Sequence, residues 1–173
     1  GLWPVGGGRR GAGVARAGGV TGTGALDEAA AAVLGGGELT GNGRDEVRLQ
    51  EAPDWEVLVW VPPAQAYSAD APREHLAAIV PMAELAEELI RDGRYAEAMA
   101  VNGFAYTAAL GYDTEPLVEA LASADAASLS GSGPAMIACG DQDALETLAE
   151  RWAERPGHLL RTATTDTGGV THE

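Results

Sequence analysis

The chain has 173 residues and a formal net charge of −15, from 26 acidic and 11 basic residues. Every basic residue is arginine, which excludes a lysine-dependent phosphate loop of the Gly-x-x-x-x-Gly-Lys type. The negative charge disfavours nucleic acid and anionic membranes as partners, and no apolar run is long enough to span a bilayer.

The acidic, lysine-free composition suits a protein kept soluble at very high salt, where charge repulsion is screened. GC-rich codon bias toward Arg, Ala and Gly would produce the same composition, and both explanations indicate a halophilic source. The single cysteine, Cys139, lies in an apolar run and is expected to be a buried small hydrophobe. One cysteine permits no internal disulfide, which is consistent with a reducing cytoplasm.

Residues 1–24 are rich in glycine and show no clear period, so we expect irregular structure there. Gly6 to Gly11 matches the dinucleotide fingerprint G-x-G-x-x-G, which would indicate a different class of enzyme. The match is weak because glycine is so frequent in this chain. The preceding Leu2 to Val5 is also too short, and too interrupted by proline, for a central strand.

A Gly/Thr loop at residues 21–24 leads into a short Ala-rich helix that ends at Gly35 to Gly37. Asp27 and Glu28 lie at the start of this helix, where the positive end of the dipole favours carboxylates. Asp27 can be a simple helix cap. A carboxylate at that position is also well placed to orient a hydroxyl nucleophile.

Further along the chain, residues 44–50 can form a short strand, and residues 55–61 are a stronger strand between two proline-containing stretches. Residues 65–72 are expected to be a loop. Three helices follow, at 82–90, 95–110 and 115–121. In the second helix we expect Met99 and Phe104 to anchor the core.

The remaining pattern predicts a strand at 126–129, a tight turn at 130–134 and a strand at 135–139. A helix at 141–155 should turn Leu145, Leu148 and Trp152 inward, and residues 158–164 form the last strand. The order strand, helices, two strands, helix, strand is compatible with a ferredoxin-like α+β sandwich with helices inserted after its first strand.

The turn from Ser130 to Pro134 carries the strongest indication of function. Gly131 and Gly133 remove the Cβ atoms that would block close approach, while backbone N–H groups and the hydroxyls of Ser130 and Ser132 gather at one point. Such a turn can hold an anion. It can also be a plain hairpin connection without a ligand.

These segments together resemble the GHMP kinases. The resemblance rests on an Asp followed by a polar residue and a short helix ending in Gly-Gly, and on the Gly-rich turn at 130–134. The archaeal shikimate kinase branch, particularly its haloarchaeal members, is the most similar that we identify. The similarity also extends over Thr23 to Glu28, residues 55–71, residues 92–95 and residues 101–105.

The resemblance implies that residues 37–173 form a GHMP kinase C-terminal domain. Residues 1–36 would be the end of the ribosomal-protein-S5-like N-terminal domain, with 1–13 irregular. The family's main ATP loop is not found in this chain, so we expect a C-terminal portion that can be inactive as it stands. The implied reaction is ATP-dependent phosphorylation of the 3-hydroxyl of shikimate in the cytoplasm, on the route to chorismate and the aromatic amino acids, with ATP and Mg²⁺ as cofactors.

The same resemblance assigns roles to individual residues. Asp27 would accept or orient the proton of the substrate hydroxyl, with Glu28 as a lesser alternative. The turn Ser130, Gly131, Ser132, Gly133 would lie beside the nucleotide phosphates. Arg73 and Asn102 are candidates for substrate binding, although a solvated residue at a helix start is the favoured interpretation of Arg73, and Asn102 can equally be a satisfied buried amide or lie on an exposed face. Homoserine kinase, mevalonate kinase and a degenerate, non-catalytic binding domain remain open alternatives.

Overall fold

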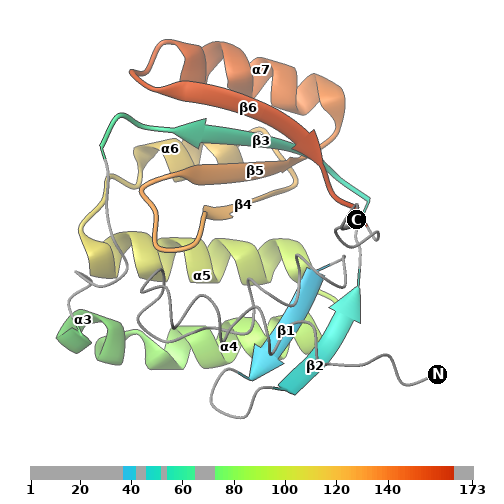
Figure 1. Cartoon of the computed structure of the whole chain (residues 1–173), viewed down its shortest axis with the longest axis vertical. Helices are drawn as coiled ribbons and strands as arrows, with labels where there is room; N and C mark the ends of the chain where they lie inside the picture. Colours follow the sequence, from blue (N-terminus) through green and yellow to red (C-terminus); the bar gives the residue numbers. More distant parts are fainter. Residues whose placement is uncertain (1–36, 42–45, 52–53, 65–72, 166–173) are drawn as a thin grey trace, which may run out of the picture. The chain divides into compact units, whose positions relative to one another are not determined.

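The computed structural model describes residues 37–41, 46–51, 54–64 and 73–165, with side chains described for residues 54–64 and 73–165 (Figure 1). The chain divides into two compact units. Unit 1 comprises residues 1–54 and 164–173, and unit 2 runs from Trp55 to Ala163. The domain boundary predicted at residue 37 stays a prediction.

Within unit 1, two strands are described. β1 (Gly37–Gly41) pairs antiparallel with β2 (Glu46–Glu51), and the register shifts between Leu39 and Thr40. The strand predicted at 44–50 is confirmed as β2, displaced by one or two residues. Strand β1 is not predicted from the sequence, because its residues, Gly-Glu-Leu-Thr-Gly, are bounded by glycines and carry little strand propensity.

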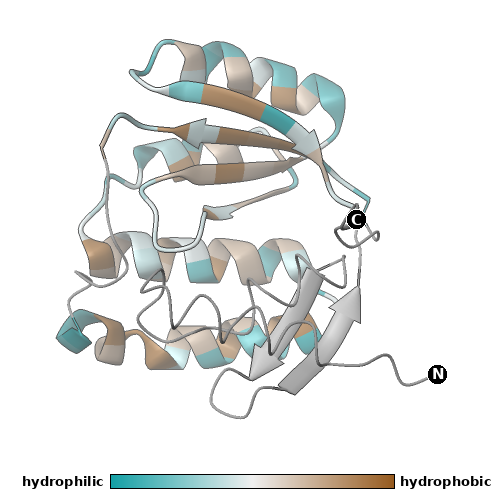
Figure 2. Cartoon of the chain, in the orientation of Figure 1, coloured by the Kyte–Doolittle hydropathy of each residue, from teal (hydrophilic) through white to brown (hydrophobic). Residues whose placement is uncertain are grey.

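Unit 2 contains an antiparallel sheet with the strand order β4-β5-β3-β6. Its strands are β3 (Glu56–Val61), β4 (Ala126–Leu129), β5 (Met136–Gly140) and β6 (His158–Ala163). The register places Leu58 opposite Ala138, and Met136 opposite Leu129. The predicted ferredoxin-like α+β arrangement is confirmed. Figure 2 shows hydrophobic residues along β3 and, along β6, a hydrophobic stretch between hydrophilic residues.

Five helices are described in this unit. They are α3 (Arg73–Ala78), α4 (Val80–Arg91), α5 (Tyr95–Leu110), α6 (Glu115–Leu121) and α7 (Gln142–Ala153). α6 and α7 pack on the sheet, α5 runs beside β4, and α4 lies on the far side of α5 (Figure 1). The last four match the helices predicted from the sequence.

The main core forms between the sheet and helices α6 and α7. Leu58, Leu117, Leu148 and Trp152 have no exposed surface. This confirms the predicted inward face of α7, where Leu145, Leu148 and Trp152 recur at helical spacing and are all buried. The side chain of Asp141 accepts a hydrogen bond of 2.8 Å from the Ala144 N–H, which fixes the start of that helix.

The prediction that Phe104 anchors the core is wrong, because its side chain is 37% exposed. Its neighbour Gly103 is buried and faces β4, together with Thr107 one turn further on. Successive residues of a helix are turned by about 100°, so Phe104 points away from this contact. Met99 is only half-buried. Small residues, which allow the close approach, therefore form the packing face of α5.

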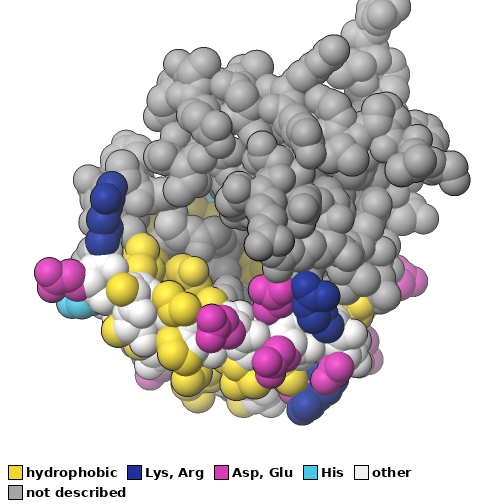
Figure 3. All heavy atoms as spheres, turned by 90° about the horizontal axis from the view of Figure 1, so that it is seen from below, with side chains coloured by type: hydrophobic (Ala, Val, Ile, Leu, Met, Phe, Trp, Pro, Cys, Tyr) yellow, Lys and Arg dark blue, Asp and Glu magenta, His cyan; other side chains and the backbone are white. Residues whose placement is uncertain are grey.

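The first half of α4 carries exposed hydrophobic side chains. Val80 is 49%, Met82 44% and Leu85 40% exposed. Figure 3 shows hydrophobic side chains on this side of the molecule, with acidic and arginine side chains among them. Further along α4, Ala86 and Leu89 are buried in a second, smaller cluster with Ala98 of α5.

Candidate functional site

The Gly-rich turn connects β4 to β5 and is tied across its base by backbone hydrogen bonds. The Ser130 N–H donates to the Ala135 carbonyl oxygen at 2.8 Å, and the Gly133 N–H donates to the Ser130 carbonyl oxygen at 2.9 Å. The Gly133–Pro134 peptide bond is cis. The structure therefore confirms the predicted strand, tight turn and strand.

Both glycines of the turn have positive φ, 56° at Gly131 and 68° at Gly133. L-residues with side chains adopt this conformation at a cost, which explains the choice of glycine. The two positions differ in the space around them. A Cβ at Gly131 would meet nothing within 4 Å, whereas a Cβ at Gly133 would come within 2.7 Å of both Leu129 Cδ1 and Tyr112 Cε2.

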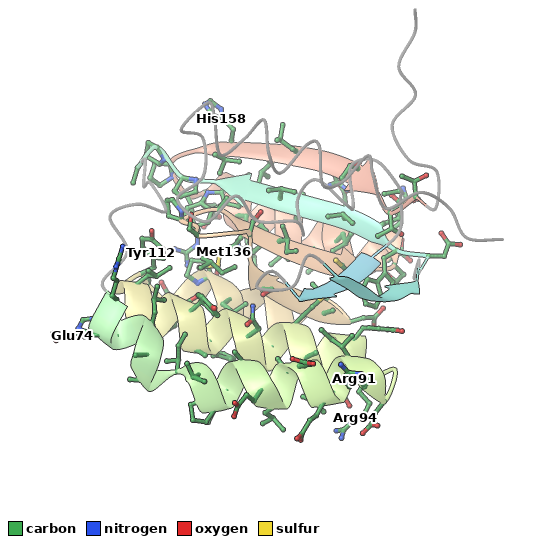
Figure 4. The ribbon with its side chains drawn as sticks, turned by 60° about the horizontal axis from the view of Figure 1, so that its bottom comes forward. Glu74, Arg91, Arg94, Tyr112, Met136 and His158 are labelled. Atoms are coloured by element: carbon green, nitrogen blue, oxygen red, sulfur yellow. The ribbon has the colours of Figure 1, made fainter. Side chains whose placement is uncertain are left out.

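Tyr112, which packs against the main core, supports the turn from the side of that core. Its hydroxyl donates a hydrogen bond of 3.1 Å to the carbonyl oxygen of Ser132. The side chain is half-buried and packs against the main core, at the end of α5 (Figure 4). Sequence reasoning missed Tyr112, since only its place directly after the helix-ending Gly111 hinted at a special position.

The front of the turn offers groups that can bind an anion. Among the described residues, the Gly131 N–H and the Ser130 hydroxyl have no hydrogen-bond partner, and Gly131 is exposed. Amide and hydroxyl donors without a Cβ in the way suit a phosphate oxygen. The geometry is compatible with the predicted ligand contact, and the ligand itself stays a prediction.

Arg73 begins α3, and its side chain is exposed. Two residues later, His75 Nδ1 lies 2.9 Å from the carbonyl oxygen of Ala109, near the end of α5. Since Tyr112 follows three residues after Ala109, this contact brings the start of α3 to the end of α5 that supports the turn. In Figure 4, Glu74 and Tyr112 lie at this end, while Arg91 and Arg94 lie at the other.

Asn102 lies elsewhere along α5. It precedes Ala109 by seven residues, about two helical turns. Its side chain is half-buried and has no hydrogen-bond partner among the described residues. Asp27 and Glu28 lie outside the described residues, so their predicted roles stay predictions.

A charged cluster ties α6 to the segment after α7. Arg155 Nη2 lies 2.9 Å from Glu119 Oε1 and 3.0 Å from Glu115 Oε2. The hydrogen bond to Glu119, followed by that to Glu115, raises the pKa of Arg155. The guanidinium carbon lies 5.9 Å from the centroid of the Trp60 ring, within the range of a cation–π interaction. We interpret this cluster as structural.

The part of the chain that the structure describes contains no group of three or more His, Cys, Asp or Glu residues able to hold a metal ion. No described helix has the length and hydropathy to cross a membrane. Cys139 is buried, as predicted, and burial raises the pKa of its thiol to about 11.

Comparisons with known proteins identify the class. Residues 82–158, which lie within unit 2, match the family "GHMP kinases C terminal". A proposed homoserine kinase from Listeria monocytogenes superposes with a TM-score of 0.54 at 20% identity, over 81% of this chain and 53% of that one. At this level of identity the likeness concerns the fold alone. Residues 82–158 thus belong to the C-terminal domain family of the GHMP kinases.

Within that family, the sequence relatives are archaeal shikimate kinases. The shikimate kinase of Halobacterium salinarum is 44% identical over 163 residues, which is 94% of this chain and 57% of the relative. That of Methanosarcina mazei is 37% identical over 155 residues, 88% of this chain and 53% of the relative. The chain thus spans only somewhat more than half the length of the curated relatives that it matches.

Proposed function

We propose that this chain is part of a GHMP-type shikimate kinase, which transfers the terminal phosphoryl group of ATP to the 3-hydroxyl of shikimate. The observation that carries the proposal is the 44% identity to the Halobacterium shikimate kinase across 94% of this chain. The Gly-rich turn supports it independently, because its glycines and free donors suit a phosphate group.

In this proposal the turn from Ser130 to Gly133 lies beside the phosphates of ATP. Phosphoryl transfer depends mainly on positioning and on stabilising charge on the phosphate oxygens. The Gly131 N–H and the Ser130 hydroxyl would supply two donors for this purpose. Mg²⁺ would reach the site bound to ATP, since it is commonly held by one or two carboxylates together with substrate phosphates.

Asp27 is the proposed acceptor, or orienting group, for the proton of the shikimate hydroxyl. It follows a Gly/Thr loop at a predicted helix start, and this pattern resembles the catalytic segment of the family. Glu28 is the alternative for the same role. An aspartate in this role aligns the attacking oxygen and removes its proton as the new P–O bond forms.

Arg73 is proposed to bind the carboxylate of shikimate. The contact of His75 with the Ala109 carbonyl supports this role, because it holds the start of α3 at the same end of α5 as the Gly-rich turn. Arg73→Ala should raise the KM for shikimate about tenfold, through loss of a charge-assisted hydrogen bond, and leave the KM for ATP unchanged. Arg91→Ala is the matched control. Arg91 is the last residue of α4, at the end away from Tyr112 (Figure 4), and it pairs with Glu87. Asn102 is a weaker candidate because of its distance along the helix.

We further propose that the protein works in the cytoplasm of a halophilic archaeon. The net charge of −15, the absence of lysine and the single reduced cysteine support this setting. Assays therefore belong in molar KCl.

The test is ATP-dependent phosphorylation of shikimate, with homoserine and mevalonate as competing substrates. The chain is assayed as given and as a fusion with the remaining part of the Halobacterium relative. Phosphorylation of shikimate alone supports the proposal. A preference for homoserine or mevalonate would replace it with a sibling activity. Inactivity of both folded proteins, beside an active Halobacterium control, would favour a non-catalytic binding domain.

A further inference from the structure

We propose that Tyr112 is a positioning residue, which sets the conformation of the Gly-rich turn for nucleotide binding. Its role toward ATP rests on the proposed kinase function, whereas its role in holding the turn can be tested by itself. Three observations carry the inference: how the Ser132–Gly133 peptide is held, how the tyrosine ring packs, and what fixes Tyr112.

The peptide between Ser132 and Gly133 is held at both ends. Its carbonyl oxygen accepts the hydrogen bond from the Tyr112 hydroxyl at 3.1 Å. Its N–H donates to the Ser130 carbonyl oxygen at 2.9 Å. A peptide unit is planar, so two such bonds fix its rotation. Removal of the hydroxyl takes away the hydrogen bond from Tyr112 to the carbonyl end, in a turn whose glycines permit many backbone conformations.

The tyrosine ring also occupies the space that a side chain at residue 133 would need. A Cβ at Gly133 would lie 2.7 Å from Tyr112 Cε2. The ring therefore packs directly against the backbone of the turn. A phenylalanine at residue 112 would keep this packing and lose only the hydrogen bond, which separates the two contributions.

Tyr112 is itself anchored by the end of α5. The helix ends at Gly111, which has φ 75°, and the Tyr112 N–H donates to the Thr107 carbonyl oxygen at 3.0 Å. Thr107 is completely buried, and α5 packs along β4. The core thus sets the position of the tyrosine, and the hydrogen bond from its hydroxyl in turn fixes the position of the Ser132 carbonyl group.

This support lies behind the turn and leaves its ligand-binding groups available. The hydroxyl occupies the Ser132 carbonyl, whereas the Gly131 N–H and the Ser130 hydroxyl have no partner within the described ranges. Loss of the Tyr112 hydroxyl should therefore loosen the geometry of these donors without removing any of them. The expected consequence is weaker binding of ATP, with little change in the binding of shikimate.

The experiment compares Tyr112→Phe with Tyr106→Phe in the folded protein in molar KCl. Tyr106 lies in α5, the helix that precedes Tyr112, and packs against the same core, and its hydroxyl has no hydrogen-bond partner among the described residues. Three quantities are measured: exchange of the Gly133 amide hydrogen, KM for each substrate, and Tm. The kinetics use whichever form of the enzyme is active.

For Tyr112→Phe we expect Gly133 exchange at least about fivefold faster and a KM for ATP about threefold to tenfold higher. The KM for shikimate should stay within about twofold, Tm should fall by no more than about 2 °C, and Tyr106→Phe should change none of these values. Unchanged Gly133 exchange would overturn the proposal. A general rise in exchange with a large fall in Tm would also overturn it, because the hydroxyl would then act on overall stability.

If the unsubstituted enzyme does not phosphorylate shikimate, the proposed function fails on its own. The exchange comparison then decides the positioning role. Faster exchange confined to residues 131–133 in Tyr112→Phe would support it, and equal exchange in both variants would overturn it.

Discussion

Gly103 of α5 lies against the backbone of Ser128 in β4. A Cβ built at residue 103 would come within 2.9 Å of the Ser128 Cα and 3.1 Å of its Oγ. The helix can approach the strand this closely only because residue 103 has no side chain. This contact sets the position of α5, and through Tyr112 that of the Gly-rich turn.

The first prediction follows from this contact. Gly103→Ala should destabilise the protein by about 1–3 kcal/mol, because overpacking against a backbone atom outweighs the gain of about 1 kcal/mol in helix propensity. Urea unfolding in molar KCl measures the change. Ala108→Gly, at an exposed site of the same helix, measures the propensity term alone. A stabilised Gly103→Ala variant would contradict the packing described here.

The two glycines of the turn provide a matched pair. Both have positive φ, so alanine at either position should cost roughly 1 kcal/mol in backbone strain. Gly133→Ala must also displace Leu129 and Tyr112, and we expect it to be more destabilising than Gly131→Ala by about 1–2 kcal/mol. Equal unfolding midpoints for the two variants would show that the space behind Gly133 is not as tight as the structure indicates.

The Arg155 cluster should depend on Glu119 more than on Glu115. The Glu119 side chain is 27% exposed and that of Glu115 68%, so the Glu115 pair is the more strongly screened by solvent. Glu119→Gln should cost about 1 kcal/mol and Glu115→Gln no more than about 0.3 kcal/mol in chemical unfolding. A larger effect of Glu115→Gln would reverse this assignment.

Cys139 gives a prediction about pH. Burial raises the pKa of its thiol to about 11, above the value of about 8.5 expected in the unfolded chain. The folded protein thus disfavours the thiolate, so the contribution of this thiol to stability should be constant below pH ~8.5 and fall as pH rises toward 11. Native protein should react slowly with a thiol reagent at pH 8, and unfolded protein rapidly. Cys139→Ala should lack this alkaline component; if it keeps the full decline, the thiol is not its source.

Most of unit 2 could be predicted from local sequence signals. Tyr95 to Leu110 is rich in good helix formers and ends before a glycine, and its bounds were predicted as the structure has them. Strand β3 is rich in valine and lies between prolines. Such signals are local, so they predict these elements without knowledge of the tertiary contacts.

The misses concern contacts between distant segments. Phe104 is expected inside because aromatic residues are usually buried. The close approach at Gly103 places that residue against β4, so the neighbouring Phe104 points away from the contact. The bond from Tyr112 to Ser132 joins residues 20 positions apart, and the one from Arg155 to Glu119 joins residues 36 apart. No periodicity in the sequence encodes such pairs.

The most direct test of the central claim is the rate of ATP-dependent shikimate phosphorylation in molar KCl, for the fusion with the remainder of the Halobacterium relative and for its Asp27→Asn variant. We predict shikimate-specific turnover in the fusion and a loss of at least about a hundredfold in kcat for Asp27→Asn, with circular dichroism unchanged. Turnover of homoserine or mevalonate in place of shikimate would contradict the substrate assignment, and an unchanged kcat in Asp27→Asn would contradict the catalytic one.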